Sequence, residues 1–163
     1  MELLIENVVE IELSDYEIER SKPMPSTNHS IIQGKIAFEL TLRYRKDYDI
    51  LPEISLDTPG KGTVPDLAIY PKLILDVRND VIRRTDAPLL TIEILSPEQK
   101  LQDLIDKTYR YFDFGVKSCW IVLPSLKTIM VYSDVDTFEY IRSDKTLIDP
   151  NWGFELPLND IFA

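Results

Sequence analysis

The chain has 163 residues, of which 44% are hydrophobic and 28% are charged, and its formal net charge is −10 at pH 7. These values are typical of a globular protein, so we expect a single domain over residues 1–163, with an arm or edge strand at 1–23. A membrane-spanning helix is excluded, because no apolar run approaches the ~20 residues that cross a bilayer. The acidic start is unlike a signal or transit peptide, and the single cysteine, Cys119, excludes an internal disulfide. We therefore expect a cytoplasmic protein.

The negative net charge weighs against a nucleic-acid partner. Affinity for DNA rests largely on neutralising phosphates, and proteins that bind it usually carry a basic surface. With a net charge of −10, this chain lacks such an overall balance. Any DNA binding would therefore need a local basic patch, a metal ion or a further partner.

The first regular element that the sequence predicts is a helix from His29 to about Tyr44. Its apolar side chains recur every four residues on one face, at Ile32, Ile36 and Leu40. The loop before it, SKPMPSTN, offers three candidate helix caps, Ser26, Thr27 and Asn28. Gly34 lowers the helix propensity, and we expect a close packing contact at that position.

Three strand-like runs follow, at residues 50–56, 64–70 and 89–95. Residues 57–63, DTPGKGT, have the composition of a hairpin loop between the first two runs. Residues 77–87 form a polar connection to the third run, and we expect their arginines to be its exposed feature.

A second helix is predicted by a complete start signal. Ser96 is the expected N-cap, Pro97 the first helical residue, and Gln99 the reciprocal partner in a capping box. Gly115 is well placed to end the helix. The expected buried face consists of Leu101, Leu104, Ile105, Thr108 and Phe112.

The remaining sequence predicts more strands and a packed tail. Residues 118–124 and 128–133 are expected to be strands joined by a turn at 125–127, residues 137–143 add another, and the apolar tail at 151–163 packs on the body. The element order predicts an α/β fold, with a mixed β-sheet flanked by helices. The connection from 89–95 through the second helix is long enough to be a parallel crossover.

Two carboxylates lie within these strand-like runs. Glu93 interrupts the apolar run LLTIEIL, and a buried carboxylate is costly unless it is paired, protonated or bound to a metal. Strand alternation would let Asp66 and Glu93 converge on one face if their strands pair. Two such oxygen ligands suit Mg²⁺ or Mn²⁺. The alternative is that Glu93 faces solvent and that Asp66 merely begins a strand.

Helix geometry favours Lys107 as a partner of Glu93. From Ser96, Glu93 lies about 10 Å back along the strand, and Asp103 lies a similar distance forward along the helix. Helical side chains lean toward the N-terminus, so Lys107 is aimed back to that level, where its charge could stabilise a phosphoryl centre. The alternative is an ordinary surface ion pair between Asp103 and Lys107.

The combination of motifs resembles the Uma-two family of restriction-endonuclease-like domains. The motifs that match are Pro65-Asp66, Glu93, Ser96-Pro97, Asp103, Lys107, Tyr111, Gly115-Val116 and Trp120-Ile121-Val122, with Met24-Pro25 and His29 upstream and LNDIF at the end. The resemblance implies the PD-(D/E)XK nuclease fold and a metal-dependent phosphodiesterase site with Asp66 and Glu93 as ligands. The lysine of that motif, two residues after the glutamate, is Leu95 here. The lysine role would then have moved to Lys107 on the helix.

Several secondary residues are candidates for the same site. The resemblance suggests that His29 lines the site, although a histidine at a helix start is more often a surface residue. Glu53 and Glu39 are candidate further ligands or water-orienting groups. Asp103 and Tyr111 complete the candidate set, because they share a helical stripe with Lys107.

We therefore expect a Mg²⁺- or Mn²⁺-dependent DNA endonuclease with Asp66, Glu93 and Lys107 as its catalytic residues. A homodimer is expected from base rates and would let two sites act on two strands. Two alternatives stay open. One is a non-catalytic interaction module on the same fold, and the other is a hydrolase of a small phosphate-containing substrate.

Overall fold

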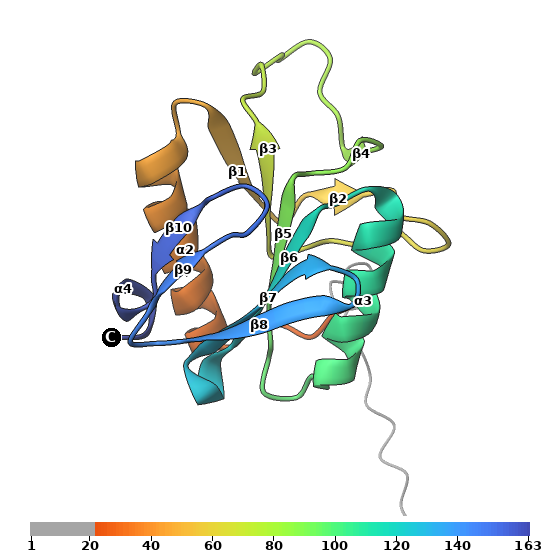
Figure 1. Ribbon diagram of the computed structural model, residues 1–163. Coiled ribbons are helices and arrows are strands. Elements are labelled where there is room, and N and C mark those ends of the chain that lie inside the picture. The colour runs from red at the N-terminus through yellow and green to blue at the C-terminus, as the bar shows by residue number, and fades with distance from the viewer. Residues whose placement is uncertain (1–21) are drawn as a thin grey trace, which may run out of the picture.

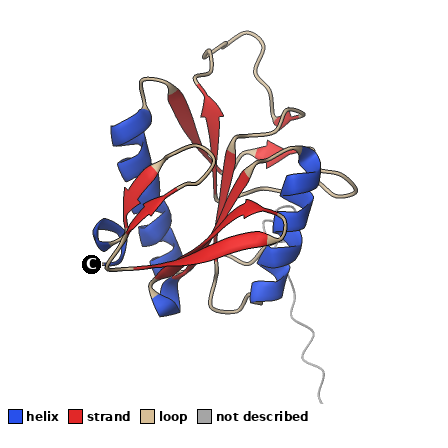
Figure 2. Ribbon diagram, in the orientation of Figure 1, coloured by secondary structure: helices blue, strands red, loops and turns tan. Residues whose placement is uncertain are grey.

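The computed structural model describes residues 22–163, so the arm or edge strand expected at 1–23 lies almost wholly outside the described residues. A six-stranded sheet runs through the centre, with helix α2 (Thr27–Tyr44) on one face and helix α3 (Leu101–Phe114) on the other (Figure 1). Figure 2 shows the same arrangement by element type, with helices on both sides of the strands. The predicted α/β class, a mixed sheet flanked by helices, is confirmed.

The sheet has the strand order β1-β3-β5-β6-β7-β8. Its strands are β1 (Tyr48–Pro52), β3 (Leu67–Pro71), β5 (Leu90–Ile94), β6 (Ser118–Leu123), β7 (Thr128–Asp134) and β8 (Thr137–Arg142). β5 and β6 are parallel and are joined through α3, as the length of that connection predicted, and the other neighbouring pairs are antiparallel. Because β3 and β5 are antiparallel, the start of β3 and the end of β5 lie together, beside His29 at the start of α2.

Shorter elements complete the described chain. β2 (Ser55–Leu56) pairs in parallel with β4 (Arg83–Arg84), and β9 (Thr146–Ile148) pairs antiparallel with β10 (Glu155–Pro157). A 3₁₀ turn, η1 (Pro124–Leu126), joins β6 to β7, and α4 (Asn159–Phe162) ends the chain. The β9–β10 pair and α4 lie beside α2, so the apolar tail packs on the body as expected (Figure 1). No helix within residues 22–163 has both the length and the apolar character that a membrane crossing requires.

Helix α2 begins at Thr27, two residues before the predicted start, behind one of its three candidate caps. Ser26 is the N-cap, and its Oγ accepts the backbone N–H of His29 at 3.2 Å, which satisfies one of the free donors of the first turn. The three expected core residues, Ile32, Ile36 and Leu40, are buried. The contact expected at Gly34 is wrong, because a Cβ there would meet no atom within 4 Å.

Helix α3 begins later than predicted, and Ser96 does not cap it. Residues 96–99 form a separate turn, in which the Gln99 N–H donates to the Ser96 carbonyl at 3.1 Å. Lys100 then adopts an extended backbone, with ψ 138°, and is the N-cap without a side-chain hydrogen bond. Gln99 does reach back to the Ser96 N–H, at 3.4 Å, so only half of the expected capping box forms. At the other end, Gly115 has φ 114° and ends α3 as predicted.

Apolar side chains fill both faces of the sheet. The face toward α2 and the tail buries residues such as Leu67, Ile92, Trp120 and Val131. The face toward α3 buries residues such as Ala68, Ile121, Met130 and Tyr132. Because Glu93 is paired in register with Ile121, strand alternation places its side chain on the α3 face.

The connection between β3 and β5 differs from the prediction. Several of its exposed side chains are apolar, with Ile74 92%, Leu75 91% and Ile82 88% exposed. Arg84 is only partly exposed, because it pairs with Asp86 at 2.7 Å and lies 4.5 Å over the ring of Tyr70. The expectation that its arginines are exposed is confirmed for Arg78 and Arg83 and is wrong for Arg84.

Candidate active site

Asp66 lies at the bend immediately before β3, close to the end of β5. Its Oδ2 accepts the backbone N–H of Ile94 at 2.7 Å and lies 3.1 Å from Nε2 of His29. The side chain is buried, with 1% of its surface exposed. Ile94 directly follows Glu93, so the backbone of Asp66, just before β3, lies next to that of Glu93 on β5.

Glu93 is the next-to-last residue of β5 and is buried, so the alternative that it faces solvent is wrong. Its Oε1 accepts a hydrogen bond of 2.5 Å from the hydroxyl of Tyr111 and lies 3.6 Å from Nζ of Lys107. Both partners project from α3 at helical spacing and are themselves buried. The cost of burying the carboxylate is therefore offset by one hydrogen bond and one opposite charge.

The hydrogen bonds of the site fix the charge of Asp66. Burial alone would raise the pKa of its carboxyl, but the His29 hydrogen bond and the nearby Lys22 charge lower that pKa from 3.8 to about 2. Asp66 is therefore an anion throughout the neutral range. An anionic, buried carboxylate is the form that a metal ligand requires.

The pKa of Tyr111, unlike that of Asp66, is shifted upward. Burial and the charge of Glu93 raise the pKa of its phenol well above 10.0, and the charge of Asp66 contributes in the same direction. Tyr111 therefore stays protonated and donates to Glu93. Because the charges of both Glu93 and Asp66 raise the pKa of this one phenol, the three residues form one electrostatically coupled cluster.

Lys107 approaches Glu93 as the helix geometry predicted. Its side chain is 8% exposed, and its Nζ is buried without a hydrogen-bond acceptor among the described residues. Asp103, by contrast, is exposed on α3. The alternative of a surface pair between Asp103 and Lys107 is therefore wrong for Lys107, since its charge is directed inward.

Sequence reasoning missed one charged residue of the site, Lys22. Its Nζ lies 2.6 Å from Oδ1 of Asp66 and donates to the carbonyl of Val64 at 3.0 Å. Lys22 precedes α2 in a proline-containing loop, where no periodicity signals which way a side chain points. The ion pair joins residues that are far apart in the chain, so no local pattern could have revealed it.

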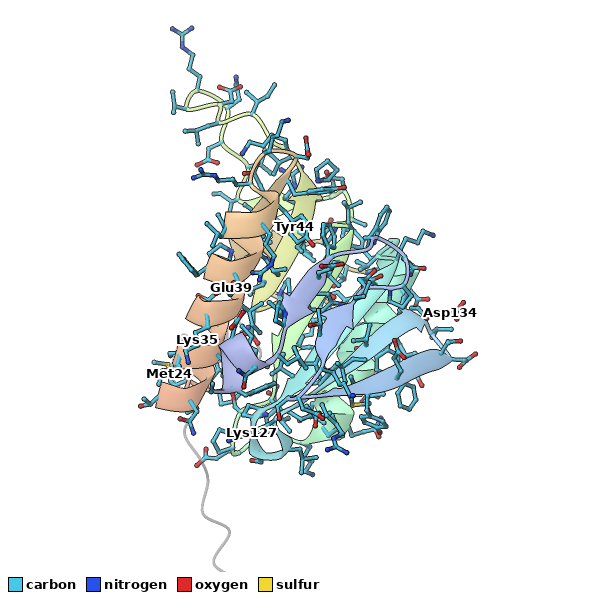
Figure 3. The ribbon with its side chains drawn as sticks, turned by 60° about the vertical axis from the view of Figure 1, so that its left-hand side comes forward. Met24, Lys35, Glu39, Tyr44, Lys127 and Asp134 are labelled. Carbon is cyan, nitrogen blue, oxygen red and sulfur yellow. The ribbon has the colours of Figure 1, made fainter. Side chains whose placement is uncertain are left out.

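The secondary candidates lie at different distances from this cluster. His29 lies in it, because its ring is buried against Asp66. Glu53 lies beside it through the backbone, since its N–H donates to the carbonyl of Asp66 at 3.1 Å. Glu39 lies further along α2 (Figure 3). It pairs with Arg43, one turn away on that helix.

The residues present fit a small, hydrated oxygen-binding cation. Within residues 22–163, no group of three or more His, Cys, Asp or Glu side chains is arranged to hold a metal ion, so a closed zinc site does not fit. Mg²⁺ is held through one or two carboxylates and keeps several waters, which matches Asp66 with Glu93. Each carboxylate has an ammonium group beside it, which compensates its charge in this structure.

Comparison with a solved structure defines the class of fold. A crystal structure described as that of "a putative nuclease belonging to DUF820 from Anabaena variabilis" matches with a TM-score of 0.74 and 23% sequence identity. The match covers 86% of this chain and 83% of that chain. At this identity it shows that the two proteins share a fold.

The family follows from the sequence. The profile of the Uma2 family, described as "Putative restriction endonuclease", matches residues 1–158. The chain belongs to the Uma2 family, which confirms the resemblance drawn from its motifs. Comparison with curated proteins gave no match.

Proposed function

We propose that the protein is a Mg²⁺- or Mn²⁺-dependent endonuclease that hydrolyses phosphodiester bonds in DNA. The observation that carries this proposal is the arrangement around β5: Asp66 bonds the Ile94 N–H from the bend before β3, next to Glu93, and Lys107 lies 3.6 Å from the glutamate. Membership of the Uma2 family supports the same reaction class.

In this proposal, Asp66 and Glu93 hold the cation. When bound, a divalent cation of this kind supplies a Lewis acid and lowers the pKa of its bound water. His29 and the Ile94 N–H hold the Asp66 carboxylate in place through Oδ2. Tyr111 holds Glu93 in the same way through Oε1.

Lys107 has the electrostatic role in this proposal. A preorganised ammonium in a water-poor site stabilises charge that develops on a phosphoryl group better than the same charge in water. In the PD-(D/E)XK pattern this lysine follows the glutamate by two residues, where this chain has Leu95. The side chain of Lys107 reaches the same carboxylate from α3, so the charge is retained although the motif is not.

Local cations offset part of the negative net charge. Lys61 and Arg110 line a pocket of about 180 Å³ together with Lys107, and Asp103 and Asp106 line the same pocket. The residues that line this pocket come from the 57–63 loop and from α3. We propose that phosphates approach the site along this side.

A non-catalytic module is the second candidate, and one observation favours it. The ammonium of Lys22 lies 2.6 Å from Asp66, so a lysine already neutralises a proposed metal ligand. A protein in which this pairing is permanent would bind no cation at the site. Cation binding therefore separates the two candidates.

The experiment is a cleavage assay on supercoiled, linear and single-stranded DNA with Mg²⁺, with Mn²⁺ and with a chelator. We expect wild type to cleave only with a divalent cation, and Glu93→Gln to lose about 10²-fold or more of that activity. Glu39→Gln is the matched control, because it removes an equal charge from the α2 pair with Arg43 and leaves Glu93 intact. The proposal fails if no substrate is cut, or if both variants lose activity equally.

The homodimer remains a prediction of the same proposal. Two protomers acting on two strands would produce double-strand breaks without a long-lived nicked product. Light scattering gives the mass in solution, and the ratio of nicked to linear plasmid in the cleavage assay tests the consequence.

A further inference from the structure

The candidate site contains two lysines that are anchored in different ways. Lys107 projects from the middle of α3, a 14-residue helix, between the buried residues Leu104 and Tyr111. Lys22 precedes the first described helix and reaches Asp66 from an irregular segment. The ammonium of Lys107 is therefore positioned by a helix, whereas that of Lys22 is held by its two contacts with Asp66 and Val64.

The charges of this cluster are already balanced. Two buried carboxylates, Asp66 and Glu93, lie beside two buried ammonium groups, those of Lys22 and Lys107. Adding a divalent cation would leave two uncompensated positive charges in a water-poor region, where like charges repel strongly. Charge balance therefore favours the departure of an ammonium group when a cation enters.

Geometry identifies which ammonium leaves. The Nζ of Lys22 lies 2.6 Å from Oδ1 of Asp66, whereas Oδ2 is held by His29 and by the Ile94 N–H. Oδ1 is thus the oxygen left for a cation, and a Mg²⁺ ion at ~2.1 Å from it would overlap the position of the ammonium. Lys107 lies 3.6 Å from its carboxylate, beyond the distance of a strong hydrogen bond.

The chain around Lys22 permits this departure. Among the described residues, residues 22–25 make no hydrogen bond to a helix or strand ladder, and α2 begins at Thr27 behind its own cap, Ser26, which accepts the His29 and Ser30 N–H groups. Moving the Lys22 side chain therefore breaks two side-chain contacts and no regular element. Withdrawing Lys107 would instead disturb the buried face of α3.

We propose that Lys22 is the residue that a divalent cation displaces at Asp66. This inference rests on the proposed metal site. Lys22 competes with the cation for Oδ1, so the lysine sets the cation concentration at which the site fills. In the cation-free state it also neutralises a carboxylate that would otherwise be buried with an excess of charge.

The first test is a Mn²⁺ titration of the full chain by calorimetry or electron paramagnetic resonance. We expect Lys22→Met to lower the Kd for Mn²⁺ by about tenfold or more, because the competing ammonium is gone. Lys46→Met is the matched control, since Lys46 is an exposed lysine beyond the far end of α2, and it should leave the Kd unchanged. Asp66→Asn should abolish binding in both backgrounds.

A second test uses the wild-type chain and does not depend on the folding of a variant. Lysine labelling with a small acylating reagent, read by mass spectrometry, should be slow at Lys22 without cation, because its side chain is only 7% exposed. Saturating Mg²⁺ should speed labelling at Lys22 and leave labelling at Lys46 unchanged.

The outcomes separate this inference from the proposed function. If Mn²⁺ binds but Lys22→Met has the wild-type Kd and Mg²⁺ leaves Lys22 labelling unchanged, the exchange is wrong and the metal site stands. If neither wild type nor Lys22→Met binds Mn²⁺, the metal site is wrong, and the exchange fails with it. Tighter binding by Lys22→Met together with faster Lys22 labelling confirms the exchange.

Discussion

The hydroxyl of Tyr111 donates a 2.5 Å hydrogen bond to Oε1 of Glu93, so helix α3 and strand β5 meet through a buried phenol and a buried carboxylate. The same oxygen lies 3.6 Å from Nζ of Lys107, one helical turn before Tyr111. Glu93 is therefore positioned by a neutral donor and a charged group from one helix. Because both contacts to Glu93 come from α3, substituting Tyr111, Lys107 or Glu93 should change how stably α3 packs on β5.

Removing the phenol hydroxyl should destabilise the fold. Tyr111→Phe keeps the ring and leaves a buried carboxylate with one donor fewer, which we expect to lower the free energy of unfolding by about 1–3 kcal/mol. Urea denaturation followed by circular dichroism measures the change. Tyr109→Phe is the control, because Tyr109 is on the same helix but 44% exposed, and an equal loss there would contradict the assigned bond.

Lys107 should affect both stability and activity. An exposed Asp103–Lys107 pair, the alternative that the sequence left open, would contribute only a few tenths of a kcal/mol, but Lys107 is buried against Glu93. Breaking a buried pair from one side costs about 3–5 kcal/mol. We therefore expect Lys107→Met to destabilise strongly in wild type and much less in a Glu93→Gln background, as a double-mutant cycle would show.

The activity of folded Lys107→Met should fall about 10²-fold or more under stabilising conditions, the scale of losing one preorganised electrostatic partner. Its affinity for Mn²⁺ should remain. Lys100→Ala is the control, because Lys100 is exposed at the start of α3. Equal losses in the two variants would indicate general attraction of phosphate instead of a specific role.

The two serines at predicted helix starts should respond differently to alanine. Ser26 Oγ accepts the His29 N–H, so Ser26→Ala should cost about 1 kcal/mol of stability, the usual loss for an N-cap. Ser96 was expected to show the same loss, but α3 begins after Lys100, so Ser96→Ala should cost less. Thermal denaturation of both variants tests this, and the reverse order would contradict the helix boundaries.

Asp66 should make the fold sensitive to acid. Its native pKa of about 2 lies below the ordinary value of 3.8, so the unfolded chain binds the proton more tightly than the native one. The resulting stability, about 2 kcal/mol, is complete above pH 5 and is lost as the pH falls through 3.8 toward 2. About 1 kcal/mol of it should be gone at pH 3.

Urea denaturation at pH 5.5 and pH 3 measures this contribution. Other carboxylates also titrate in that range, so the relevant quantity is the difference between wild type and Asp66→Asn. The variant should be less stable at pH 5.5 and should lose less stability on acidification. A parallel loss in both proteins would show that Asp66 does not have a depressed pKa.

The sequence predicted those features of the site that depend on local periodicity. Alternation along strands and the pairing of adjacent runs predicted neighbouring positions for Asp66 and Glu93, and Asp66 does bond the N–H of Ile94, the residue after Glu93. Their joint role at a cation stays a prediction. Lys107 reached Glu93 because strand and helix rise are constant along each element. Ile32, Ile36 and Leu40 were placed in the core for the same reason.

Other features depend on contacts that no local pattern contains. The pairing of Lys22 with Asp66 joins an irregular segment to a bend 44 residues away. The start of α3 was misplaced because the extended backbone of Lys100 interrupts a sequence whose residues favour a cap at Ser96. The apolar side chains exposed at 74–82 have no structural explanation in the described part of the chain.

A crystal soaked in Mn²⁺ tests the central claim most directly. Anomalous scattering would locate the ion independently of any assay for DNA cleavage. We predict one peak in contact with carboxylate oxygens of both Asp66 and Glu93, with the Lys22 ammonium moved away from Oδ1 of Asp66. A fully soaked crystal with no peak between these carboxylates, and with Lys22 still paired to Asp66, would contradict the account.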